Sequence, residues 1–249
     1  MAFRTGARWL PGLLAGLALS QGALASGLQV DPVTVAIDGR SGIVWLSNVG
    51  DAPLDAQVRV YRWTQDGAGE HLAATDALVA SPPQIKVAQG GRQLVRLVLA
   101  APPGATTGAC EDTYRITVNE LPPPRAEGER GLRYVMQYSI PVFATSRACG
   151  KIAPALTWRL EQADGEVRLA VTNAGRMHAQ LSQLSFIDAA GQRTELNPGL
   201  VGYVLAGARM TFPLKLPPAL FAGDGQIEVF ANGAKVVQTL SLGAAAAAQ

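Results

Sequence analysis

Residues 132–143 read Leu-Arg-Tyr-Val-Met-Gln-Tyr-Ser-Ile-Pro-Val-Phe, and they decide how the chain folds. Successive side chains of a β-strand point to opposite faces, so a strand here carries a row of large apolar or aromatic side chains on one face. That row consists of Leu132, Tyr134, Met136, Tyr138 and Ile140. Proline has no backbone N–H to donate to a neighbouring strand, so Pro141 predicts a sheet edge or a bulge at this end.

An edge strand with such a row has two interpretations. Proteins usually avoid this combination, because unpaired backbone groups and apolar side chains together attract other chains. The first interpretation is therefore a strand that is lent to another protein. The second is an ordinary core strand in which Pro141 lies beyond the last paired residue.

The composition limits the class of protein. A chain of 249 residues holds one or two domains and buries a sizeable core. The formal net charge is +2, and no run of Lys and Arg alternates with aromatic residues, so nucleic acid is not expected as a partner. Only 16% of the residues are charged, while 27 are glycine and 16 are proline, which favours short strands joined by turns over helices.

The N-terminus resembles a secretory signal peptide. Arg4 and Arg8 precede an apolar run over residues 9–19, and Ala23-Leu24-Ala25 supplies small residues at the cleavage positions. We expect residues 1–25 to be removed by cleavage after Ala25. The alternative, a membrane anchor, is disfavoured because the apolar run is too short to span a bilayer comfortably. Later stretches are not apolar enough to span either, so we expect an exported protein that is not membrane-embedded.

The mature chain reads as two series of strands. Roughly seven short strands with regular turn signals precede residue 146, which is typical of an immunoglobulin-like sandwich. A second series follows a short linker, with Asp164-Gly165 and Asn232-Gly233 as hairpin turns. We therefore predict an all-β protein with immunoglobulin-like β-sandwich domains at 26–146 and 147–243, and a frayed alanine-rich tail at 244–249.

Several blocks of the sequence resemble, in their order, the periplasmic pilus chaperones of the PapD-like superfamily. The blocks that resemble the N-terminal domain of that family are 55–63, Ser81-Pro82-Pro83, 93–97, 112–116, 119–122 and 139–143. Those that resemble the C-terminal domain are 171–175, His178-Ala179 and 202–207. The resemblance implies two domains set at an angle, with a cleft between them that receives the C-terminus of a pilus or fimbrial subunit. It also implies a periplasmic location and delivery of the subunit to an outer-membrane usher.

The resemblance also implies a mechanism, donor-strand complementation. A pilus subunit of this kind is an incomplete sandwich with an open apolar groove, and the chaperone adds a strand to it. By the resemblance, that strand is 132–143. The side chains assigned to the groove are Leu132, Tyr134, Met136, Tyr138 and Ile140. The alternative function is a secreted two-domain immunoglobulin-like adhesion or pilus structural module.

The usual anchor for the subunit's terminal carboxylate is absent. Better-known members of the family use an Arg in the first strand and a Lys near the end of the donor strand, and here those places hold Thr34 and Pro141. The chain in this respect resembles the archaic branch, which serves spore-coat-protein-U-like subunits. Arg115 is the first candidate for the anchor, because it lies on the polar face of the strand beside the donor strand and a guanidinium binds a carboxylate in bidentate fashion. Arg96 is the second candidate, and a solvated strand arginine is the alternative for either.

The two cysteines suggest one disulfide in an exported protein. Cys110 precedes the strand at 113–119, and Cys149 follows the donor strand. If those strands form an antiparallel hairpin, both cysteines lie at the same end of it. Two free thiols are the alternative.

Enzymatic activity is not expected. His71 and His178 are the only histidines, and each stands beside a predicted turn as a surface or packing residue. The sequence has no Gly-x-Ser-x-Gly elbow, no Cys-x-x-Cys and no paired histidines on a helix. We therefore predict no catalytic residues, no cofactor and no metal site.

Overall fold

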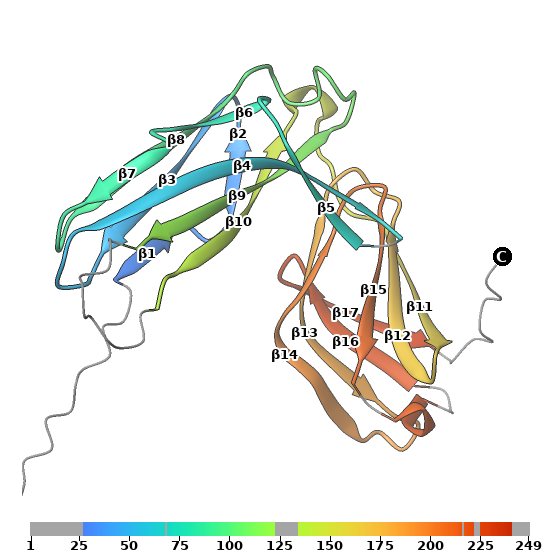
Figure 1. Cartoon of the computed structure of the whole chain (residues 1–249). Helices are drawn as coiled ribbons and strands as arrows, with labels where there is room; N and C mark the ends of the chain where they lie inside the picture. Colours follow the sequence, from blue (N-terminus) through green and yellow to red (C-terminus); the bar gives the residue numbers. More distant parts are fainter. Residues whose placement is uncertain (1–26, 68, 123–133, 216, 222–224, 241–249) are drawn as a thin grey trace, which may run out of the picture.

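The computed structural model describes residues 27–67, 69–122, 134–215, 217–221 and 225–240. Nearly all of its elements are strands, and they form two β-sandwiches set at an angle (Figure 1). The predicted fold class is therefore confirmed. The proposed signal peptide at 1–25, the tail at 244–249 and Leu132 lie outside the described residues.

The N-terminal sandwich contains two sheets. The first has the order β1 (Leu28–Asp31), β3 (Ser41–Asn48), β8 (Arg92–Leu99) and β6 (Leu78–Ser81). The second has the order β2 (Val35–Asp38), β10 (Gln137–Thr145), β9 (Glu111–Leu121), β4 (Leu54–Asp66) and β5 (Gly69–Ala74). The strand β7 (Gln84–Val87) pairs with the start of β4. All pairs are antiparallel except β2 with β10.

Alternation along the strands builds the core of this sandwich. In β8, Val95 and Leu97 are buried while Arg96 between them is exposed, as expected when one face of a sheet is covered. The inner faces of the two sheets pack together, so that Leu46 of β3 and Ile116 of β9 belong to one apolar cluster.

The C-terminal sandwich also contains two sheets. One has the order β11 (Leu156–Ala163), β12 (Glu166–Asn173) and β15 (Arg209–Leu214). The other has the order β14 (Arg193–Val204), β13 (Ala179–Ile187), β16 (Gly225–Ala231) and β17 (Ala234–Leu240). Two short 3-10 helices complete the described part: η1 (Arg147–Cys149) and η2 (Pro218–Phe221). In the ranges given above, no helix has the length and hydropathy needed to cross a membrane.

Both hairpin turns predicted in this domain are confirmed. Asp164 and Gly165 join β11 to β12, and Asn232 and Gly233 join β16 to β17. All four residues have positive φ, between 48° and 78°. A two-residue hairpin turn of this kind needs positive φ at both positions, which Asp-Gly and Asn-Gly pairs adopt readily.

The same kind of buried corner occurs once in each domain. Asn48 ends β3 and Asn173 ends β12, and each is almost fully buried. In each case the Oδ1 atom accepts a hydrogen bond of 3.0 Å from the N–H of the glycine two residues later. The Nδ2 atoms donate to the carbonyls of Val87 and Val204 respectively, at 3.1 Å in both cases. Each asparagine therefore binds the chain leaving its own strand to a distant strand of the same domain.

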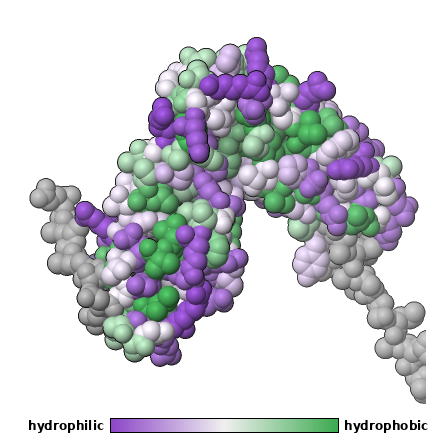
Figure 2. Space-filling model, turned by 180° about the vertical axis from the view of Figure 1, so that it is seen from behind, coloured by the Kyte–Doolittle hydropathy of each residue, from purple (hydrophilic) through white to green (hydrophobic). Residues whose placement is uncertain are grey.

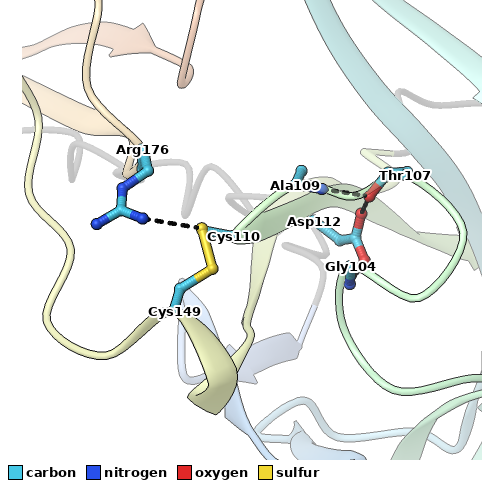
Figure 3. The surroundings of a disulfide bond; sticks show 7 residues. All are labelled: Gly104, Thr107, Ala109, Cys110, Asp112, Cys149 and Arg176. Carbon is cyan, nitrogen blue, oxygen red and sulfur yellow. Dashed lines mark hydrogen bonds between the residues drawn. A yellow bond between two sulfur atoms is a disulfide. The ribbon is translucent and has the colours of Figure 1, made fainter.

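The predicted disulfide joins Cys110 to Cys149, with a Cα–Cα distance of 5.7 Å (Figure 3). It links the start of β9 to η1, the segment that leads into the second domain. Arg176 of the C-terminal domain lies close by, with Nη1 3.8 Å from the Cys110 Sγ atom. Asp112 fixes the preceding loop by accepting a 2.8 Å hydrogen bond from the N–H of Gly104. The bridge therefore lies at the junction of the two domains.

Candidate functional site

One side of β10 is only partly covered. The strand pairs with β9 along its whole length, from Gln137 opposite Asn119 to Thr145 opposite Glu111. On its other side it pairs with β2 only from Val142 onward. Along Gln137 to Pro141, no strand among the described residues pairs with that side. The sheet therefore has an open edge that stops where β2 begins.

The predicted strand at 132–143 is shifted in the structure. Regular strand begins at Gln137 and continues to Thr145, beyond the predicted end. Just before it, the carbonyl of Met136 accepts a 3.0 Å hydrogen bond from the N–H of Glu120, and the Met136 N–H donates to the Glu120 carboxylate at 3.1 Å. The chain is therefore already held beside β9 at Met136.

The predicted row of side chains changes from exposed to buried along the chain. Tyr134 is 56% exposed and Met136 is 40% exposed. Tyr138 is half-buried, and its hydroxyl donates a 2.6 Å hydrogen bond to the carbonyl of Leu28. Ile140 is only 1% exposed and lies in the core of its own domain. The row is therefore not presented as a whole, because β10 is covered by its own sandwich from Ile140 onward.

An exposed apolar cluster surrounds the start of β10. Tyr134, Val135 and Met136 are all at least 40% exposed, and Leu121 at the end of β9 is 38% exposed. Large apolar side chains that gather next to an unpaired strand edge mark a contact surface for another chain. This cluster and the open edge form one continuous stretch of the N-terminal domain.

Arg115 lies one strand in from the open edge. It is on β9, directly opposite Pro141 of β10. The centre of its guanidinium is 4.0 Å from the centre of the Trp63 ring. The face of an aromatic ring attracts a cation, so this contact stabilises the charged side chain. Nη2 is 3.3 and 3.4 Å from the carboxylate oxygens of Glu70, and Nη1 is 3.4 Å from the hydroxyl of Ser139. Only 14% of the side chain is exposed, so the alternative of a freely solvated strand arginine is wrong.

Arg96, the second candidate, is not brought to this site. It is on β8 in the other sheet, opposite Ile43 of β3 and Ser81 of β6, and its side chain is exposed. The sequence could not separate the two arginines, because both stand on the polar face of an alternating strand. The structure separates them, since only the sheet of Arg115 contains β10.

The junction between the domains lies beside Arg115. A small apolar cluster joins residues of both sandwiches, namely Trp63, Phe143, Tyr203, Leu205 and Ala208. The amide side chain of Gln65 on β4 binds the other domain at two points, donating to the carbonyl of Tyr203 at 2.9 Å and accepting from the N–H of Leu205 at 2.8 Å. These contacts join the two sandwiches at one end. Figure 2 shows the hollow that remains between them.

His178 is a packing residue of this junction. Its ring stacks on Phe143 with a centroid distance of 3.4 Å. Its Nδ1 atom lies 2.9 and 3.0 Å from the two carboxylate oxygens of Glu111, whose side chain is 1% exposed. This confirms the expectation of a packing role for His178. Its partner could not be predicted, because Glu111 is 67 residues away in the chain.

A signal for the junction was nevertheless present in the sequence. Residues 140–144 are all apolar, and the structure buries every one of them. A strand that is apolar without alternation has both faces covered. Ile140 and Val142 face the core of the N-terminal domain, whereas Phe143 packs against the other domain.

The N-terminal domain matches a known family. Residues 27–147 match the family described as "Pili and flagellar-assembly chaperone, PapD N-terminal domain". The chain belongs to the PapD-like assembly chaperones. The predicted family is confirmed, and because its members are chaperones and not enzymes, the prediction of a non-enzymatic protein is confirmed with it.

Solved structures of such chaperones have the same two-domain fold. CsuC, in complex with the tip adhesion subunit CsuE of the archaic Csu pili of Acinetobacter baumannii, matches 87% of this chain and 99% of its own, with a TM-score of 0.64 and 23% identity. The YadV chaperone matches 86% of this chain and 100% of its own, with a TM-score of 0.61 and 17% identity. The SafB chaperone, in complex with the SafA pilin of Salmonella enterica, matches 88% and 99%, with a TM-score of 0.60 and 14% identity. A search among curated proteins found no relative of this PapD-like chain.

Proposed function

We propose that this PapD-like protein acts in the periplasm, binds a pilus subunit by donating the edge of β10 to it, and delivers that subunit to an outer-membrane usher. The observation that carries the proposal is the open edge from Gln137 to Pro141, which continues into the exposed Tyr134 and Met136. An added strand there would satisfy the free backbone groups of β10 and extend the sheet. Solved relatives of the fold include chaperone–subunit complexes, which supports a subunit as the partner.

The exposed side chains supply part of the binding energy. Tyr134 is 56% and Met136 is 40% exposed, so roughly half of each remains to be buried. Full burial of a large apolar side chain contributes about 1.5–3 kcal/mol, so half-burial of this pair would contribute about 1.5–3 kcal/mol in total. Association costs about 4–15 kcal/mol in lost freedom. The pair is therefore insufficient by itself, and backbone hydrogen bonds and a terminal anchor have to supply the rest.

The start of β2 gives the added strand a fixed end. Because β2 occupies the side of β10 from Val142 onward, a guest strand cannot continue past Pro141. The residue opposite Pro141 on the next strand is Arg115. A guest that runs parallel to β10 would bring its terminal carboxylate to this point, where a guanidinium attracts it. Arg115 is therefore the proposed carboxylate anchor, in place of the Thr34 and Pro141 positions used elsewhere in the family.

Export to the periplasm completes the proposal. Residues 1–25 would act as the signal peptide, leaving chaperone domains at 26–146 and 147–243. The Cys110–Cys149 disulfide suits an oxidising compartment. No nucleotide motif is present in the sequence, so we infer that release of the subunit at the usher is driven by the folding of the subunits themselves.

Replacing both Tyr134 and Met136 by glutamate tests the donated edge. The double variant would place two charges in the apolar groove of the subunit, and we expect at least a tenfold loss of subunit recovered from periplasmic extracts, equivalent to about 1.4 kcal/mol. The matched control replaces Leu200 and Val237 by glutamate, because these side chains are 53% and 48% exposed on the other domain. Unchanged recovery with the Tyr134 and Met136 variant, at normal chaperone levels, would show that this edge is not donated.

A further inference from the structure

The guanidinium of Arg115 is already occupied by a carboxylate of the same chain. We propose that Glu70 is a resident carboxylate, which holds the anchor in the free protein and is displaced by the terminal carboxylate of the subunit. This inference rests on the proposed function. It adds a specificity-determining residue on β5, a strand that does not border the open edge.

The contacts of Arg115 leave room for a better partner. Its carboxylate contacts with Glu70 measure 3.3 and 3.4 Å, longer than the 2.7–2.9 Å typical of charge-assisted hydrogen bonds. The Nε atom is buried and has no hydrogen-bond partner among the described residues. Because Nε is buried, an incoming carboxylate would meet Nη1 and Nη2, and one that approached them at about 2.7–2.9 Å would bind more favourably than Glu70 does.

Glu70 is placed so that it can leave. It is the second residue of β5, and 39% of its side chain is exposed. Within the described ranges, its one other side-chain contact is a 3.3 Å hydrogen bond from the amide of Gln65, the residue opposite it on β4. Rotation of the Glu70 side chain into solvent would therefore break only long contacts.

The neighbouring acids cannot replace Glu70. Glu111 is bound to His178, and Asp112 forms a 3.0 Å ion pair with Arg62. Both of these carboxyl groups are at most 5% exposed. Glu70 is thus the acid that compensates the charge of the mostly buried Arg115 while no subunit is bound.

Displacement would make the anchor selective. A guest that ends in a carboxylate replaces one anion by another and leaves the guanidinium neutralised. A guest that ends in an amide would have to remove Glu70 without supplying a charge, so Glu70 would stay. The pair therefore discriminates for free chain ends, at the expense of some affinity.

Fluorescence anisotropy with a labelled peptide tests the proposal. The probe is an eight-residue peptide of alternating valine and threonine, made once with a free C-terminal carboxylate and once with a C-terminal amide. We expect Glu70→Gln to tighten binding of the acid about two- to fivefold, the range set by an exposed ion pair, and to leave binding of the amide unchanged. Glu70→Ala should behave alike. The control is Glu161→Gln, because Glu161 pairs with Arg209 on the other domain.

Arg115→Gln separates the two proposals. If Arg115→Gln removes the preference for the acid and Glu70→Gln tightens its binding, both the anchor and its displacement are supported. If Arg115→Gln removes the preference but neither Glu70 variant tightens binding, the displacement is wrong and the anchor stands. If neither the wild type nor any variant binds the acid peptide better than the amide peptide, Arg115 is not the anchor. The displacement of Glu70 is then wrong as well.

Discussion

Replacing Asn173 by alanine should destabilise the C-terminal domain far more than its small loss of volume suggests. The side chain is fully buried and takes part in four hydrogen bonds. The Nδ2 atom binds the carbonyls of Met177 and Val204, and the Oδ1 atom accepts from the N–H groups of Ala155 and Gly175. Alanine would leave all four backbone groups without these partners.

The magnitude follows from how far water can reach those groups. The hydrogen bond to the Val204 carbonyl is buried, and the other three are partly buried. An unsatisfied buried group costs about 1–3 kcal/mol, and a bond that water can replace costs about 0.5 kcal/mol. We therefore expect Asn173→Ala to lower the free energy of unfolding of its domain by about 2.5–4.5 kcal/mol.

Urea unfolding followed by fluorescence measures the effect. Trp158 lies in the C-terminal core and Trp63 at the domain junction, so the transitions of the two domains can be compared. Asn48→Ala is the twin variant, and it should destabilise the N-terminal domain by about 2–4 kcal/mol, since three bonds are lost there. Asn197 of β14 accepts an exposed 2.8 Å hydrogen bond from the N–H of Gly199, so Asn197→Ala should change stability by less than about 0.5 kcal/mol. Values for Asn173→Ala and Asn48→Ala no larger than that of Asn197→Ala would refute the reasoning.

Two further predictions concern stability. Replacing Cys110 and Cys149 by serine removes a cross-link between residues 39 apart, which should cost about 3–4 kcal/mol in urea unfolding; no loss relative to the disulfide-bonded wild type would contradict this. The pKa of Glu228 is lowered in the folded protein, chiefly by its hydrogen bond to Lys235 and by Arg193. The ionised carboxylate therefore stabilises the fold above the unfolded pKa of about 4.3, and this contribution is lost as the pH falls through the lower folded pKa. Thermal melts should therefore show Glu228→Gln less stable than the wild type at pH 7 and similar to it at pH 2, and parallel curves at both pH values would count against this assignment.

The sequence was most informative where the signal is local. The Asp164-Gly165 and Asn232-Gly233 pairs predicted their hairpins, because only a few residues tolerate positive φ at two successive positions. The Cys110–Cys149 bridge followed from the order of two neighbouring strands. Residues 132–143 were recognised as unusual for the same reason, since the apolar row and Pro141 lie within one short segment.

Contacts between distant segments could not be predicted in this way. Ile140 has the same parity as Tyr134, and nothing nearby in the chain shows that β10 enters its own core between them. Arg96 and Arg115 look alike until the sheets are assigned. Glu70 is 45 residues from Arg115, so no spacing rule would connect them. The open edge itself depends on where β2 stops pairing, which is a property of the register and not of the composition of any strand.

The position of β2 has one more consequence for the choice of guests. A guest strand beside β10 is stopped by β2 at the Val142 end, whereas toward Gln137 no strand of the described part of the chain pairs with that side. The chaperone would then recognise each subunit by its C-terminal residues. The length or sequence of the part further from the C-terminus would have little effect on binding. One chaperone could then bind different pilus subunits that resemble one another only at their C-termini.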